Sequence, residues 1–224
     1  LEIFFNSVKL IFSLDFLLFE IIILSLKVSF TALVISSFFA LISGYFLALN
    51  EFYLKNVIII LFNSLMGIPP VVVGLIVYFF LARGGPLGIL GLLYTPTAMI
   101  IAQFIIITPI MLSLIISNIQ EEYYLFKEEL CSYGANLVDI IKLLLTNKYK
   151  IFITISIIGF GRAVSEYGAA VIVGGSIDHL TRSITTTIAQ ETSKGNIYLA
   201  LQLGLILIII SFVISFIAQM KNKK

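Results

Sequence analysis

Long stretches of this chain carry no charged side chain. Residues 57–82 and 95–117 contain no Asp, Glu, Lys or Arg, and each stretch is longer than the roughly 20 residues that a helix needs to cross about 30 Å of hydrocarbon. The whole chain is 60% apolar and only 12% charged, whereas soluble proteins carry about 25% charged residues. The sequence therefore predicts an all-α integral membrane protein.

The apolar windows predict five membrane-spanning segments. We place them at residues 21–49, 57–82, 95–117, 151–174 and 197–218. Charged side chains interrupt the N-terminal stretch, residues 1–20, which also lacks a small-residue cleavage pattern. We therefore expect an interfacial segment there rather than a secretory signal. Residues 21–218 then form one transmembrane domain, and residues 219–224 form a short tail.

An odd number of spans puts the two chain ends on opposite sides of the membrane, and the distribution of lysine and arginine chooses between the two orientations. The side that holds the tail and residues 118–150 collects eight of them: Lys55, Lys127, Lys142, Lys148, Lys150, Lys221, Lys223 and Lys224. The opposite side collects four: Lys9, Arg83, Arg182 and Lys194. This excess predicts a cytoplasmic C-terminus and an external N-terminus.

The longest polar connection, residues 118–150, lies between the third and fourth predicted spans. It is rich in glutamate and lysine and has Gly134 near its centre. Apolar residues follow at roughly helical spacing between Leu137 and Leu145. An amphipathic segment that is broken by glycine and joins two membrane helices indicates a docking surface for a soluble partner.

The fourth predicted span contains an arginine and a glutamate one helical turn apart. Arg162 lies about 17 Å along the helix from Ile151, near the middle of the membrane. An arginine at that depth costs roughly 2.5–3.5 kcal/mol to insert, and Glu166 is placed to pair with it on the same face. One interpretation is a neutralised pair that holds helices together. The other is that Arg162 offsets the charge of an anion on a polar path and that Glu166 restrains Arg162.

Polar and helix-breaking residues also interrupt the second and third spans. Proline inside a membrane helix frees carbonyl groups, and irregular backbone at this depth faces protein or water rather than lipid. Helix breaks can also aim backbone amides at an anion. Taken together these residues predict a translocation path or gate, although each one alone is equally consistent with helix packing. The set is Asn63, Ser64, Pro69, Pro70, Gln103, Arg162, Ser165 and Glu166.

Several kinds of chemistry are excluded by the sequence. No glycine-rich phosphate loop ending in Gly-Lys-Ser or Gly-Lys-Thr occurs, so the chain is not expected to hydrolyse ATP itself. No nucleophile–base–acid set is visible either, so we expect no enzyme. Cys131 is the only cysteine and His179 the only histidine, which excludes a cysteine or histidine metal cluster. A net charge of +2 is too small to indicate nucleic-acid binding.

Five stretches resemble the permease subunits of bacterial ABC importers for oxyanions. Residues 63–78 (NSLMGIPPVVVGLIVY), 83–88 and 159–175 (GFGRAVSEYGAAVIVGG) are similar to the branch that imports sulfate, molybdate or tungstate. Residues 94–103 (YTPTAMIIAQ) and 185–196 (TTTIAQETSKGN) resemble the tungstate-type permeases most closely. The resemblance extends over most of the chain.

The polar connection also resembles the coupling motif of that superfamily, which has a glutamate, two alanines, three variable residues and a glycine. The chain reads EELCSYG here, so Glu128 and Gly134 match the motif, whereas Glu129 and Leu130 stand where the family has alanine. The resemblance implies a type I importer permease with a coupling helix in this connection. It implies these ATPase-coupling residues: Glu128, Glu129, Gly134, Ala135 and Leu144.

The resemblance further implies a function and partners. The chain is expected to be the transmembrane permease of an ATP-driven tungstate importer in the bacterial plasma (inner) membrane, with molybdate or sulfate as alternative substrates. A second copy of the permease, two ATPase subunits that bind ATP-Mg and an extracytoplasmic oxyanion-binding protein are the expected partners. No cofactor is expected in this chain. Closure of the ATPases would move the coupling segment and open the spans outward, and hydrolysis would reset them.

Two other interpretations stay open. An ion-coupled secondary carrier would need its own ion site in the membrane, and Glu166 could serve as that site. A structural membrane subunit of a larger enzyme complex would explain the docking segment but would show no substrate flux.

Overall fold

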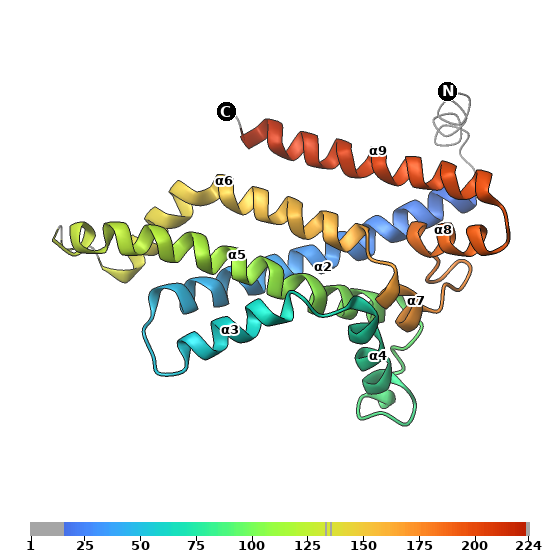
Figure 1. The fold of residues 1–224 in the computed structure, drawn as a ribbon, viewed down its shortest axis with the longest axis horizontal. Coiled ribbons are helices and arrows are strands. Elements are labelled where there is room, and N and C mark those ends of the chain that lie inside the picture. Colours follow the sequence, from blue (N-terminus) through green and yellow to red (C-terminus); the bar gives the residue numbers. More distant parts are fainter. Residues whose placement is uncertain (1–15, 133, 135, 223–224) are drawn as a thin grey trace.

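The computed structural model describes residues 16–132, 134 and 136–222, and these residues form helices joined by turns and loops (Figure 1). In chain order the elements are α2 (Phe16–Leu49), α3 (Lys55–Leu65), α4 (Pro70–Leu81), the 3-10 turn η1 (Gly88–Leu90), α5 (Pro96–Ser132), α6 (Leu137–Val164), α7 (Gly168–Gly174), α8 (Ile184–Ser193) and α9 (Ile197–Asn222). The predicted all-α class is confirmed. Residues 1–15 of the predicted interfacial segment lie outside the described residues, and residues 16–20 already belong to α2.

Within the described residues, four helices are long and apolar enough to cross a membrane. They are Leu18–Leu49, Pro96–Leu125, Asp139–Val164 and Ile197–Met220. The pair α3 and α4 passes the same test together but is bent by 104°. The chain is therefore a multi-pass membrane protein, and its described part holds four candidate spanning helices, or five where the bent pair counts as one span.

The second predicted span is thus not one straight helix. The helix α3 ends at Leu65, and the backbone amides of Gly67 and Ile68 bond back to the carbonyls of Ser64 and Leu65 in tight turns. Proline at residues 69 and 70 cannot donate to a continuing helix, and Pro69 adopts an extended conformation before α4 starts. The proline pair therefore ends one helix and begins another in a new direction.

The fourth predicted span, residues 151–174, is also broken. The helix α6 ends at Val164, where the amides of Ser165 and Glu166 close tight turns onto carbonyls of the last helical turn. The short helix α7 then begins at Gly168, and the Glu166 carboxylate caps it by accepting a hydrogen bond from the Ala169 amide at 3.2 Å. The carboxylate stabilises a new helix start, which the apolar pattern alone does not reveal.

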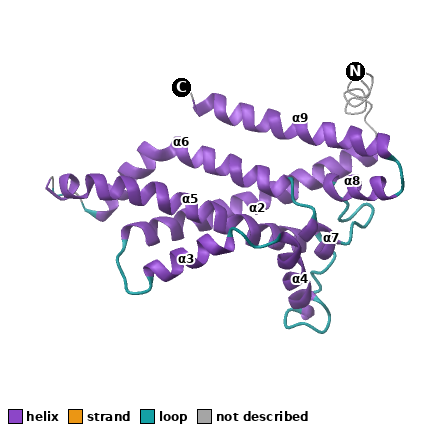
Figure 2. Cartoon of the chain, in the orientation of Figure 1, coloured by secondary structure: helices purple, strands orange, loops and turns teal. Residues whose placement is uncertain are grey.

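The predicted polar connection, residues 118–150, is helical over most of its length. The helices α5 and α6 continue through it and meet in a short turn at one end of the molecule (Figure 2). Asn136 caps α6 with Asp139 in a reciprocal capping box, and Lys148 of α6 forms a 2.6 Å ion pair with Glu122 of α5. The connection is therefore a helical hairpin that extends the two membrane helices, and we call it the α5–α6 hairpin.

The helices α2 and α5 pack along the centre of the bundle. Ala32 and Ala40 of α2 and Ala102 of α5 are fully buried, and Thr108 donates a hydrogen bond to the Ser36 hydroxyl across the contact at 3.0 Å. Small residues let membrane helices approach closely. This pair forms the frame against which the two broken helices are placed.

Candidate functional site

The two helix breaks lie against each other because α4 packs on α7. A Cβ atom on Gly74 would lie 2.7 Å from the Cα atom of Ala169, and a Cβ on Gly168 would lie 2.6 Å from Cγ2 of Val71. Only glycine allows such a close approach of two helix backbones. The starts of α4 and α7 are therefore held together, and the proline pair of the first break faces the second break.

Arg162 and Glu166 form an ion pair at the second break. Their closest atoms, Nη2 and Oε2, are 3.8 Å apart, and the arginine side chain is 39% exposed whereas the glutamate side chain is 5% exposed. The Glu166 carboxylate is committed to capping α7. Among the described residues the guanidinium has no closer partner, so most of its donors remain available to an anion.

Arg162 lies at the end of α6 rather than in its middle. The predicted depth was counted from residue 151, but α6 begins at Leu137 and ends at Val164, which puts Arg162 about 38 Å along the helix. The neighbouring Ala163 carbonyl accepts a hydrogen bond from Gln103, which is only seven residues from Pro96 at the start of α5. The pair therefore lies toward the end of the bundle that carries α8.

Gln103 is buried instead of lining an open surface. Its Nε2 donates to the Ala163 carbonyl at 3.0 Å, and its Oε1 is buried with no hydrogen-bond partner. The side chain is 5% exposed. In this conformation the Gln103 side chain links α5 to the end of α6 and stabilises the second helix break from the buried side.

A small polar cavity beside Glu166 contains residues that the sequence did not single out. Serine and threonine hydroxyls from α2 and from the start of α8 line it together with Glu166 and Gln103. Ser25 accepts a hydrogen bond from the Ile184 amide at 2.8 Å, and Thr185 donates to the Glu166 carbonyl at 3.1 Å. The volume of about 10 Å³ holds at most one water, so an oxyanion does not fit. The sequence signals that could have indicated it are the i, i+4 spacing of Ser25 and Ser29 and the serine and threonine residues between 183 and 187.

The remaining predicted path residues are exposed. Asn63 and Ser64 lie on the exposed face of α3, one helix before the proline pair, and Ser64 bonds to its own helix at the Ile60 carbonyl. The Ser165 hydroxyl donates to the Arg162 carbonyl at 3.1 Å. The structure therefore gathers five predicted residues at the paired breaks and leaves Asn63 and Ser64 on the preceding helix. The five are Pro69, Pro70, Arg162, Ser165 and Glu166.

Of the predicted coupling residues, Glu128 and Glu129 belong to α5, Gly134 lies in the turn after it, and Leu144 belongs to α6. Gly134 has a φ of +73° in the turn, a conformation that favours glycine. Ala135 and the side chains of Glu128 and Glu129 lie outside the described residues. Leu144 is 2% exposed, so it packs inside the bundle and supports the hairpin rather than offering a contact surface.

A charged cluster joins α8 to the loops on either side of it. The Glu191 carboxylate accepts hydrogen bonds from Lys194 at 2.9 Å, from Arg182 at 3.1 Å and from Asn196 at 3.1 Å. The hydrogen bond from Lys194 is the largest of the effects that lower the pKa of Glu191. These contacts fix the conformation of the connections before and after α8, the end of the molecule where Arg162 lies.

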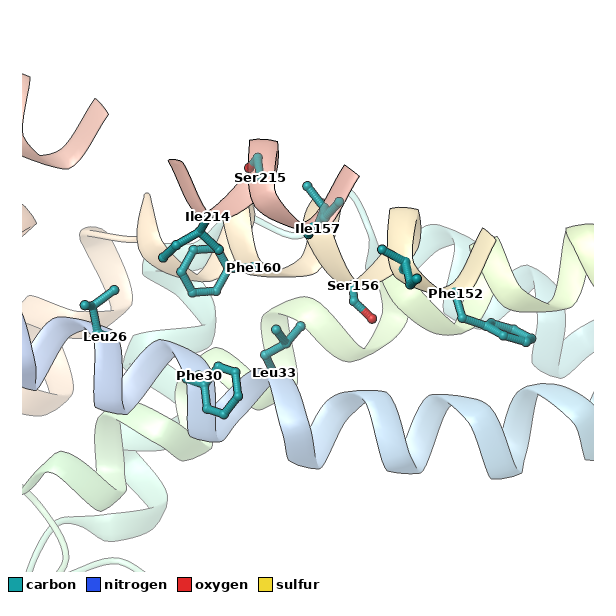
Figure 3. A pocket seen from close by; sticks show the side chains of 11 residues that line it. Leu26, Phe30, Leu33, Phe152, Ser156, Ile157, Phe160, Ile214 and Ser215 are labelled. Atoms are coloured by element: carbon teal, nitrogen blue, oxygen red, sulfur yellow. The ribbon is translucent and has the colours of Figure 1, made fainter. Parts of the chain in front are cut away.

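A much larger cavity between described residues is apolar and lies elsewhere. It measures about 570 Å³ between α2, α6 and α9. Figure 3 shows Phe30 and Leu33 of α2 and Phe160 of α6 around it, with Ser156 and Ser215 contributing single hydroxyl groups. A surface of this composition suits hydrocarbon and not an anion. The polar groups at the paired helix breaks are therefore the candidate functional site.

Three curated proteins are similar to most of the chain. The tungstate uptake system permease protein TupB of Peptoclostridium acidaminophilum is 43% identical over 166 residues, which cover 74% of this chain and 72% of that protein. The protein of the same name from Campylobacter jejuni is 39% identical over 175 residues, covering 75% and 71%. A probable anion ABC transporter permease protein of Haloferax volcanii is 38% identical over 163 residues, covering 70% of each. No family model matches the chain.

Proposed function

The chain belongs to the family of ABC transporter permeases for tungstate and other anions, and from this premise we propose that it forms the membrane path of a tungstate importer. The observation that carries the proposal is the 43% identity to a tungstate uptake permease over 72% of that protein's length. Molybdate and sulfate are the alternative substrates, because they are tetrahedral dianions of the same kind.

Arg162 is the residue that we assign to the anion. Its guanidinium is partly exposed, and its only close acidic partner among the described residues caps a helix at the same time. Guanidinium groups bind oxyanions through two parallel N–H donors. We propose that Arg162 binds the oxyanion at the paired breaks, while Glu166 stabilises the conformation of the second break.

A second copy of the chain would complete the path. The polar cavity beside Glu166 is too small for the substrate, and the 570 Å³ cavity between α2, α6 and α9 is apolar. The exposed groups of the paired breaks, among them Ser165 and Arg162, lie on the surface of a single chain. Two copies facing each other would enclose these groups, so we propose a homodimer with the path between the subunits.

Transport of this substrate needs an energy source outside the chain. Moving one negative charge inward against about 100 mV costs roughly 2.3 kcal/mol, and a dianion costs about twice as much. The sequence holds no phosphate loop, so we propose that two partner ATPase subunits bind ATP-Mg and dock on the α5–α6 hairpin. An extracytoplasmic binding protein would deliver tungstate at the end that carries α8, in a bacterial plasma membrane with the N-terminus outside.

The experiment that tests the class is purification of the tagged chain in mild detergent, with mass spectrometry of the proteins that accompany it. We expect an ATPase subunit to co-purify and to be lost from a Gly134→Val variant, in which the left-handed turn is strained. The matched control is Gly161→Ala, where an added Cβ contacts nothing within 4 Å. A chain that arrives alone and drives uptake from an ion gradient would be a secondary carrier, which contradicts the proposal.

The experiment that tests the path uses vesicles that contain the purified complex, with ATP inside and tungstate uptake measured by elemental mass spectrometry. We expect Arg162→Gln to abolish ATP-dependent uptake while the complex still assembles, and Arg162→Lys to keep part of it. Wild-type uptake by Arg162→Gln would show that the pair is only structural. Competition by molybdate and sulfate then ranks the three oxyanions.

A further inference from the structure

Three tyrosines from three different elements are exposed near the base of the α5–α6 hairpin. Tyr53 lies in the connection between α2 and α3 and is 99% exposed, Tyr124 of α5 is 55% exposed, and Tyr149 of α6 is 46% exposed. The role in transport proposed above uses none of them. Large aromatic side chains left this open need an environment that suits both a ring and a hydroxyl group.

Two side-chain contacts place the three tyrosines at one level of the bundle. The Tyr124 hydroxyl donates to the Glu51 carboxylate at 2.7 Å, and Glu51 lies two residues before Tyr53. On the other side of α5, Glu122 pairs with Lys148 at 2.6 Å, next to Tyr149. Since one helical turn is about 5.4 Å long, the three side chains lie within roughly one turn of each other along the bundle.

The distance to the opposite end matches a bilayer. The helix α5 runs 28 residues from Pro96 to Tyr124, which is about 42 Å, and a bilayer with its headgroups is about 40–45 Å thick. Exposed apolar side chains of α3 begin four residues after Tyr53 and include Val57 and Ile60. The level of the three tyrosines therefore borders the lipid-facing surface, where tyrosine is enriched in membrane proteins.

We propose that Tyr53, Tyr124 and Tyr149 form a belt that binds the phospholipid headgroups on the side of the α5–α6 hairpin. The rings of Tyr53 and Tyr149 lie against the upper acyl chains and their hydroxyl groups reach the headgroups, an arrangement that amphipathic aromatic residues favour. The Tyr124 hydroxyl stays bonded to Glu51 at the same level. Figure 1 shows that α3 and α6, which carry or adjoin two of the tyrosines, lie on opposite sides of α5. A bilayer surrounds the molecule and reaches both sides, whereas one docked protein covers one side.

The belt sets how far the hairpin stands in water. Beyond Tyr124, α5 continues for eight residues to Ser132, about 12 Å. On the other arm, α6 runs 12 residues from Leu137 to Tyr149, about 18 Å. A partner that docks on this end therefore reaches only the outer 12–18 Å of the hairpin. The belt itself does not depend on the substrate proposed above.

Site-directed spin labelling of the full chain tests this placement. The native thiol is removed by Cys131→Ser, and single cysteines are introduced in Tyr53→Cys, Tyr149→Cys, Lys142→Cys and Ile60→Cys variants. The labelled proteins are placed in vesicles of phosphatidylethanolamine and phosphatidylglycerol. Collision rates with oxygen, which enters hydrocarbon, and with a water-soluble nickel complex then report the depth of each label.

We expect the nickel-to-oxygen ratio to rise from Ile60→Cys, through the two belt positions, to Lys142→Cys, which is exposed on the hairpin. Leu54→Cys, next to Tyr53 and also exposed, replaces Tyr53→Cys if that variant does not fold. The proposal would be overturned if the labels at the belt positions were as accessible to nickel as the label of Lys142→Cys. It would also be overturned if the label of Lys142→Cys lay at hydrocarbon depth. Loss of both collision rates at the belt on addition of an ATPase subunit would assign the tyrosines to a protein partner instead.

Discussion

One added methyl group can test whether the two helix breaks act as a unit. Gly74 of α4 faces the backbone of α7, and a Cβ atom there would lie 2.7 Å from Cα and 3.2 Å from Cβ of Ala169. Backbone atoms cannot move aside as a flexible side chain does. The variant Gly74→Ala therefore has to push α4 away from α7.

The size of the effect follows from two opposing terms. Overpacking costs typically about 1–3 kcal/mol, and alanine in place of glycine inside a helix recovers roughly 0.5–1 kcal/mol. The matched control is Gly161→Ala in α6, where the new Cβ contacts nothing within 4 Å, so only the favourable term acts. The free energies of unfolding of the two alanine variants are thus expected to differ by about 1–3 kcal/mol.

The assay is the thermal unfolding of each purified variant in detergent, followed by the loss of the monodisperse peak in size-exclusion chromatography. For a chain of this size the expected difference is roughly 2–4 °C in Tm per kcal/mol, with Gly74→Ala the less stable variant. We also expect Gly74→Ala to reduce tungstate uptake, whereas Gly161→Ala leaves it unchanged. Equal Tm values for the two alanine variants would refute the tight α4–α7 contact.

Three further predictions concern single contacts. The hydrogen bond from Lys194 helps to hold the pKa of Glu191 below its ordinary value of 4.5. The stability that this carboxylate adds is therefore fully present above about pH 5 and is lost as the pH falls through the lowered pKa. The Glu191→Gln variant should show a flatter dependence of Tm on pH in that acid range. The Lys148→Met variant should lower the free energy of unfolding by about 1 kcal/mol and make the hairpin more sensitive to protease. Adding Glu122→Gln should lower this free energy no further, which a double-mutant cycle measures. The Gln103→Leu variant loses one hydrogen bond of about 0.5–1.5 kcal/mol, but it also removes a buried acceptor that has no partner. Its free energy of unfolding should therefore be nearly that of the unchanged protein. A decrease in this free energy of more than about 2 kcal/mol would contradict the prediction.

The apolar windows predicted the helices because burial in lipid leaves a backbone no partner but itself. They did not predict where the helices break. Pro69 and Pro70 indicated an irregular backbone in the second span, but the 104° bend depends on α4 packing against α7. The second break depends on a Glu166 side chain that caps a helix start, a contact that forms only in the folded chain.

The α5–α6 hairpin shows why a charged segment was interpreted as a loop. Charge content reports that a segment lies in water, but it does not report the conformation of the backbone. The buried side chains Ile140 and Leu144 continue the helical period of α6, and the capping box at Asn136 starts that helix. The helical spacing was recognised in the sequence, whereas the capping box and the continuation of both membrane helices through the charged residues were not.

The position of Arg162 changes what its charge can do. Inserting an arginine at the centre of a bilayer costs roughly 2.5–3.5 kcal/mol. The hydrogen bond from Gln103 to Ala163 instead places the Arg162 guanidinium about 10 Å from the start of α5, and the side chain is partly exposed there. On the proposed function, a dianion that enters from the end with α8 meets this charge early. Arg162 then binds the anion at the paired breaks, so its loss removes a binding step on which uptake depends. The electrical cost of crossing remains, and it has to be met by motion that starts at the α5–α6 hairpin on the opposite side.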